Sequence, residues 1–149
     1  MAEINTFISG ELTIKKIIGE VTADELMNAL RQFYTGHITK NVVWDLTNGS
    51  AGKLMPINIE HIAELVLQHA HVRIGGKAAI VAPNDLNYGM SRMFNTYAEL
   101  GSIPFETQIF RTLSEAGLWM GVDALSAIEG TGGRESPSGT SSELPQTQE

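Results

Sequence analysis

The stretch from Lys77 to Tyr97 constrains the fold of this chain more than any other. It begins with a short apolar run, Ala78-Ala79-Ile80-Val81-Ala82, and the lack of alternation is typical of a strand buried on both faces. After a polar turn at Pro83-Asn84-Asp85, apolar residues recur at helical spacing: Leu86, Met90, Met93, Phe94 and Tyr97. A central strand covered by the amphipathic helix that follows it predicts an α/β domain.

Other strands are predicted on both sides of this stretch. Alternating apolar residues over 4–8 and 12–18 predict a β-hairpin near the sheet margin, because Lys15 and Lys16 interrupt the alternation in the manner of an edge strand. The run Val42-Val43-Trp44 predicts an internal strand over 41–46, and 105–110 is predicted as the last strand.

Helices are predicted between these strands. Capping boxes begin at Thr22 and Thr112, and Asn84 is a candidate N-cap with Asp85 in the first turn. Apolar periodicity over 56–72 predicts a further helix with Asn58 as its N-cap. The succession of elements predicts a mixed, mainly parallel central sheet of about five strands with about four helices, and right-handed connections.

Residues 1–128 are expected to form this single domain. Residues 129–149 contain Leu144 as their only large apolar side chain, so they are predicted to be a disordered C-terminal tail.

Charge and cysteine content restrict the function. The net charge of −7 and the pI near 5.0 argue against a nucleic-acid partner, which usually meets a basic patch. Cysteine is absent, so disulfides and thiolate chemistry are excluded. The start of the chain shows no leader pattern, and no stretch of roughly 18 apolar residues occurs. The expectation is a cytoplasmic protein, with peripheral membrane association left open.

Three segments carry a resemblance to a known family: Val43-Trp44-Asp45-Leu46, then 82–85 with Tyr88-Gly89-Met90, and 110–116. With the order of elements, they make residues 4–122 similar to the STAS fold of anti-sigma factor antagonists, most closely to the SpoIIAA-like group, which is also compared with lipid carriers. The resemblance implies regulatory binding, ligand carriage or membrane association, without catalysis.

The chain departs from phosphorylated antagonists at one point. Their helix-capping serine is replaced by the stretch Gly52-Lys53-Leu54-Met55-Pro56. Ser50 is a weak phosphorylation candidate, and its alternative role is that of a turn hydroxyl.

A ligand-binding site is predicted where the two buried strands end. Carboxyl ends of adjacent parallel strands share one sheet edge, where open α/β sheets bind ligands. The polar candidates for this edge are Asp45, Asn48, Asn84, Asp85, Tyr88 and Arg92. The structural alternative is that Asp45 binds turn amides and Asp85 stabilises the helix start.

Met90 and Met93 are the apolar candidates, since methionine adapts to irregular apolar ligands; core packing is the alternative. His61, His69 and His71 lack the i, i+4 spacing of a helical zinc site, and His37 follows a helix-ending glycine. No metal site and no cofactor are predicted, because glycine-rich phosphate-binding motifs are also absent.

Three functions remain open. The first is a non-enzymatic regulatory module that binds a protein partner or itself, as a homodimer. The second is a carrier or sensor of an apolar ligand or membrane surface, which works by movement of the 84–100 helix. The third is an enzyme that uses Asp45 and Asp85.

Overall fold

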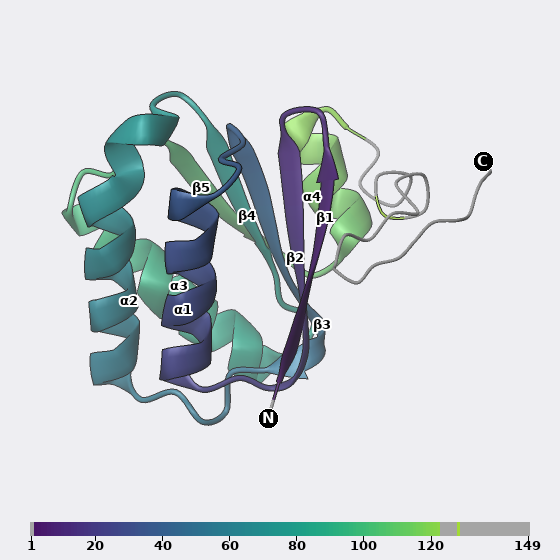
Figure 1. The fold of residues 1–149 in the computed structure, drawn as a ribbon. Helices are drawn as coiled ribbons and strands as arrows, with labels where there is room; N and C mark the ends of the chain where they lie inside the picture. The colour runs from purple at the N-terminus through teal and green to yellow at the C-terminus, as the bar shows by residue number, and fades with distance from the viewer. Residues whose placement is uncertain (1, 123–127, 129–149) are drawn as a thin grey trace.

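The structure is a computed structural model that describes residues 2–122 and 128. Its elements follow one another in the order β1 (Glu3–Ser9), β2 (Leu12–Glu20), α1 (Ala23–Thr35), β3 (Asn41–Ser50), α2 (Pro56–His69), η1 (Ala70–Arg73), β4 (Lys77–Val81), α3 (Asp85–Leu100), β5 (Glu106–Phe110) and α4 (Leu113–Met120). The predicted α/β class is confirmed (Figure 1). The predicted tail, 129–149, lies outside the described residues.

The five strands form one sheet in the order β1-β2-β3-β4-β5. β1 pairs antiparallel with β2, and every later pair is parallel. The two buried strands lie side by side as predicted, with Val42 opposite Ala78 and Trp44 opposite Ile80. A strand order that equals the chain order places each connecting helix beside the strands that it joins.

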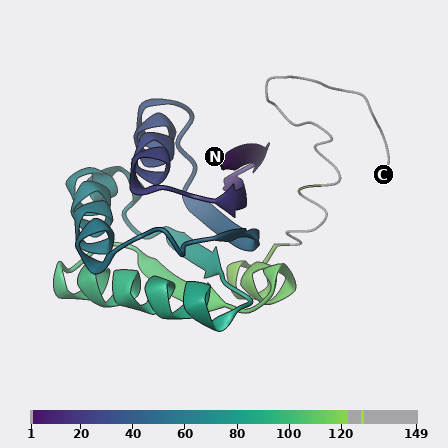
Figure 2. The same ribbon diagram turned by 90° about the horizontal axis from the view of Figure 1, so that it is seen from below.

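Helices cover both faces of the sheet unequally. α1, α2 and α3 pack on one face, and α4 packs on the other (Figures 1 and 2). Side chains alternate along β3, so Val42 joins the core beneath α1 and α2 while Val43 joins the core beneath α4. The larger core therefore lies on the three-helix face.

The position of β2 corrects one prediction. β1 is the marginal strand of the hairpin, whereas β2 lies between β1 and β3. Lys15 is buried and its Nζ donates to Thr6 Oγ1 at 2.9 Å, and Lys16 pairs with Asp45 at 3.6 Å. The prediction that these lysines mark an edge strand is wrong, because β1 and β3 supply their polar partners.

The start of α2 corrects a second prediction, that of the helix N-cap. The helix begins at Pro56, so Asn58 lies in its first turn and is not the N-cap. Asn58 Oδ1 instead accepts a hydrogen bond from the backbone N–H of Met55 at 2.8 Å. The capping boxes at Thr22 and Thr112 and the N-cap Asn84 are confirmed.

Candidate functional site

An apolar cavity lies between the sheet and the three helices of the larger core. Its volume is about 100 Å³. Trp44 and Ile80 line it from the sheet, Leu30 from α1, Val66 from α2, and Met90 from α3. The side chains come from elements far apart in sequence, so the cavity depends on the complete fold.

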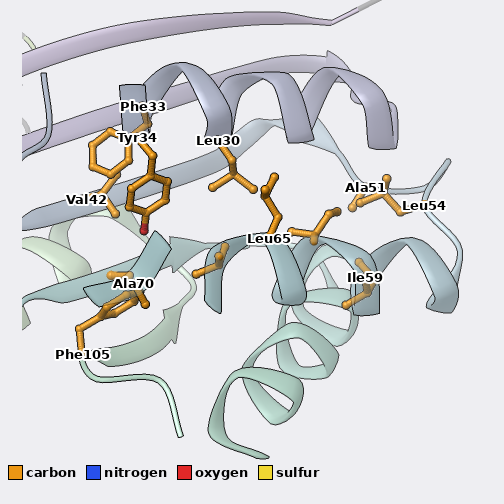
Figure 3. Close-up of a cluster of buried hydrophobic side chains, with 13 residues drawn as sticks. Leu30, Phe33, Tyr34, Val42, Ala51, Leu54, Ile59, Leu65, Ala70 and Phe105 are labelled. Atoms are coloured by element: carbon orange, nitrogen blue, oxygen red, sulfur yellow. The ribbon is translucent and has the colours of Figure 1, made fainter. Parts of the chain in front are cut away.

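The lining is elongated along β3. Both Val42 and Leu46 contribute to it, and a parallel strand rises about 3.3 Å per residue, so the lining extends about 13 Å. Figure 3 shows Tyr34 and Phe105 at one end of the core and Leu54 at the other. The cavity therefore has two distinct ends, one at the strand starts and one at the strand exits.

Helix α3 closes the cavity with loosely buried side chains. Its fully buried residues are small or polar: Asn87, Ser91 and Ala98. The predicted apolar residues Met90 and Met93 are both half-buried against the larger core, and Met90 also lines the cavity. This packing leaves α3 fewer large buried anchors than α1, which buries Phe33 and Tyr34.

Asn87 attaches the start of α3 to the exit of β3. Its side chain is fully buried, with Oδ1 accepting from the N–H of Ala51 at 2.8 Å and Nδ2 donating to the carbonyl of Gly49 at 2.9 Å. Sequence reasoning missed Asn87. An asparagine three residues after an N-cap, on the sheet-facing side of the helix, was the available signal.

Arg73 occupies the cavity end at the strand starts. The side chain is 2% exposed and lines the cavity. Nε donates to the carbonyl of Thr39 at 3.2 Å, Nη2 donates to the carbonyls of Lys40 at 2.9 Å and Lys77 at 2.8 Å, and Nη1 donates to Tyr34 Oη at 3.3 Å. These partners carry no formal charge, so the guanidinium is a buried cation among neutral oxygens.

Two aromatic rings complete this end. The guanidinium carbon of Arg73 lies 4.3 Å from the ring centroid of Phe105 and 5.6 Å from that of Phe33. Both distances fit cation–π contacts. Sequence reasoning missed Arg73 as well, although an arginine between Val72 and Ile74 just before a buried strand was the available signal.

Asp45 lies on the opposite face of the sheet from this cavity. It is buried, alternates with Trp44 along β3, and accepts hydrogen bonds from the N–H of Thr47 at 2.9 Å and from its hydroxyl. Asp45 thus pairs with Lys16 and binds the amide of Thr47 within β3. The expectation that Asp45 binds turn amides is wrong, because β3 continues past Thr47 to Ser50.

The predicted residues of α3 form a separate surface group. Asp85 pairs with Arg111 at 3.1 Å with its side chain 96% exposed, and Arg111 also stacks 4.0 Å from the ring centroid of Tyr88. Asn84 caps the helix through the N–H of Asn87 at 2.8 Å.

Asn48 and Arg92 are exposed. Asp45 and Asp85 thus belong to different ion pairs, and the predicted crevice residues are divided between β3 and the α3 surface.

Ser50 serves a turn, since its Oγ accepts from the N–H of Gly52 at 3.0 Å. His69 stacks on the ring of Tyr34 with the centroids 5.2 Å apart. Within residues 2–122 and 128, no three His, Asp or Glu side chains gather as metal ligands. In the same part of the chain, no helix combines the length and apolar character needed to cross a membrane.

Comparison of the chain with protein-family models and with curated proteins gave no match. The resemblance to the STAS fold therefore stays a prediction from the sequence.

Proposed function

We propose that this protein binds an apolar small molecule in the cavity between the sheet and helices α1, α2 and α3. The supporting observation is the cavity itself, because most of the side chains that line it from the sheet and from the three helices are apolar. Well-packed cores contain few voids larger than a water molecule. A void of about 100 Å³ inside the larger core is therefore a candidate binding site.

Binding of a larger molecule requires the cavity to expand. Its volume of about 100 Å³ is below the roughly 300 to 1,000 Å³ of pockets for drug-sized ligands. Helix α3 is the element best suited to move, since Met90 adapts its shape easily and the large side chains of α3 are only half-buried. The proposed carrier or sensor works by outward movement of α3.

The experiment compares two enlargements on α2. Val66→Phe adds a ring inside the cavity, whereas Ile57→Phe makes the same kind of change at an exposed position of the same helix. If the added ring takes the space of two methylene groups of the ligand, the binding free energy falls by about 1.6 kcal/mol, because those groups are no longer buried. Val66→Phe should then bind the neutral fluorescent probe Nile red at least about tenfold more weakly.

Ile57→Phe should bind the probe like the unmodified protein. Thermal melts of both variants verify that each one folds. Native mass spectrometry of freshly purified protein should also detect a bound apolar molecule. The proposal fails if the unmodified protein does not bind Nile red, or if both variants bind it equally well.

The other two functions have weaker support. An enzyme based on Asp45 and Asp85 lacks a shared site, because the carboxylates pair separately with Lys16 and Arg111. Binding of a protein partner, a second copy or a membrane surface stays a prediction. This binding can be tested by substitution of the exposed apolar side chains at the starts of α2 and α3, which are Met55, Ile57 and Leu86.

A further inference from the structure

We propose that the molecule in the cavity is an apolar monocarboxylate, such as a fatty acid, whose carboxylate binds Arg73 and Tyr34. This inference rests on the proposed function and specifies its ligand class. It starts from the charge of Arg73, the one charged side chain among the described residues that line the cavity.

The charge of Arg73 lacks an anionic partner in the part of the chain that the structure describes. The ion pairs there involve Lys16, Lys53 and Arg111, and each acceptor of Arg73 is a neutral carbonyl or hydroxyl oxygen. Burying a cation without an anion is costly. A carboxylate in the cavity would supply the missing charge at the place where the charge is buried.

The hydrogen-bonding capacity at this end also fits a carboxylate. Arg73 has five N–H groups, and the described contacts use one on Nε, one on Nη1 and two on Nη2, which leaves one on Nη1. Tyr34 Oη accepts from Nη1 and keeps its own proton to donate. One N–H and one O–H are thus available to the two oxygens of a carboxylate.

The guanidinium is held in place before a ligand arrives. Three backbone carbonyls at the starts of β3 and β4 fix it, those of Thr39, Lys40 and Lys77. A Cβ at Gly76 would collide with the carbonyl oxygen of Lys40, so glycine there permits the close approach of these strand starts. A preorganised cation loses little conformational entropy on binding.

The length of the cavity lining matches the rest of the molecule, which enters when outward movement of α3 expands the cavity. From the Arg73 end the apolar lining continues about 13 Å along β3 to Leu46, which suits an extended alkyl chain. The rings of Phe33 and Phe105 beside the guanidinium favour a small planar head group over a bulky one.

The experiment measures displacement of Nile red by decanoic acid and by 1-decanol, which share a chain and differ in the head group. A charge-assisted hydrogen bond is roughly twice as strong as a neutral one. We therefore expect the acid to bind at least about tenfold more tightly than the alcohol at neutral pH.

Two tyrosine variants then locate the head group. Tyr34→Phe should weaken binding of the acid several-fold more than binding of the alcohol, so that the preference for the acid falls. Tyr97→Phe is the matched control, because Tyr97 packs on the same core without lining the cavity. Arg73→Lys, if it folds, should also lose the preference, since lysine cannot reproduce the fixed fork of donors.

The outcomes separate this inference from the proposed function. Equal displacement of the probe by the acid and the alcohol would overturn the inference that the ligand is a carboxylate. It would leave the proposal of an apolar site intact. A preference that Tyr34→Phe does not diminish would also overturn it, because the carboxylate would then bind elsewhere. If neither compound displaces the probe, and the probe itself does not bind, the proposed function fails too.

Discussion

At the scale of single residues, Asn87 connects the helix next to the cavity with the sheet. Its amide satisfies the carbonyl of Gly49 and the N–H of Ala51, both of which lie where β3 ends. Leucine has nearly the same shape but cannot form either hydrogen bond.

Asn87→Leu should lower the free energy of unfolding by about 2 to 4 kcal/mol, because each unsatisfied buried backbone group costs about 1 to 3 kcal/mol. Urea denaturation measures this loss. The same change at the exposed Asn48 should alter stability by about 0.5 kcal/mol or less. Equal effects at the two positions would mean that the Asn87 bridge contributes little.

Glu25 is a second residue with a measurable signature. The backbone N–H of Thr22 donates to its carboxylate at 2.9 Å and lowers its pKa below the ordinary value of 4.5; desolvation opposes this shift, and the N–H of Ala2 adds to it. Because the folded-state pKa is lower than the unfolded one, the carboxylate stabilises the fold above pH 4.5 and the benefit is lost as the pH falls through the folded-state pKa.

Glu25→Gln should therefore lower the urea midpoint at pH 7, and the difference from the unmodified protein should shrink as the solution is acidified below pH 4.5. Glu64→Gln, at an exposed position of α2, is the control that should show no such dependence. A difference that stays constant with pH would mean that the charge of Glu25 is not involved.

At the scale of elements, α1 and α3 cover the same sheet face with different side chains. α1 buries Leu30, Phe33 and Tyr34, whereas α3 buries the smaller Asn87, Ser91 and Ala98. Most helical stability in proteins comes from tertiary packing, so α3 should open more easily than α1.

Hydrogen exchange followed by mass spectrometry tests this difference. Amides in the middle of α3 should exchange faster than those in the middle of α1 in the ligand-free protein, and a bound apolar acid should slow exchange in α3 selectively. Equal protection of both helices without ligand would contradict the proposed movement of α3.

Local signals explain why the elements could be predicted. The capping boxes at Thr22 and Thr112 and the helical spacing after Asn84 are contained within a few residues of sequence. Lys15 and Lys16 were misinterpreted because their partners, Thr6 and Asp45, lie on other strands. The local sequence shows that a lysine is present in the strand, but only the fold determines which hydrogen-bond or ion-pair partner it finds.

At the scale of the whole molecule, the sheet could be predicted and the cavity could not. Unbroken apolar runs at Val42 and Ile80 were sufficient to place two parallel strands side by side. The cavity is lined by side chains of the sheet and of three helices, which come together only in the complete fold. Arg73 joins it through carbonyls of residues 39, 40 and 77, which no sequence spacing relates to one another.

The sequential strand order has a consequence for how the chain folds during its synthesis. β1 and β2 form a hairpin from adjacent residues, and each later strand adds to the edge that the preceding strand leaves open. Among the strands of residues 2–122, none has to insert between two that are already paired. The sheet can therefore grow from the N-terminus while the ribosome is still translating the C-terminal part, and the edge that awaits the next strand moves from β2 to β3 and then to β4.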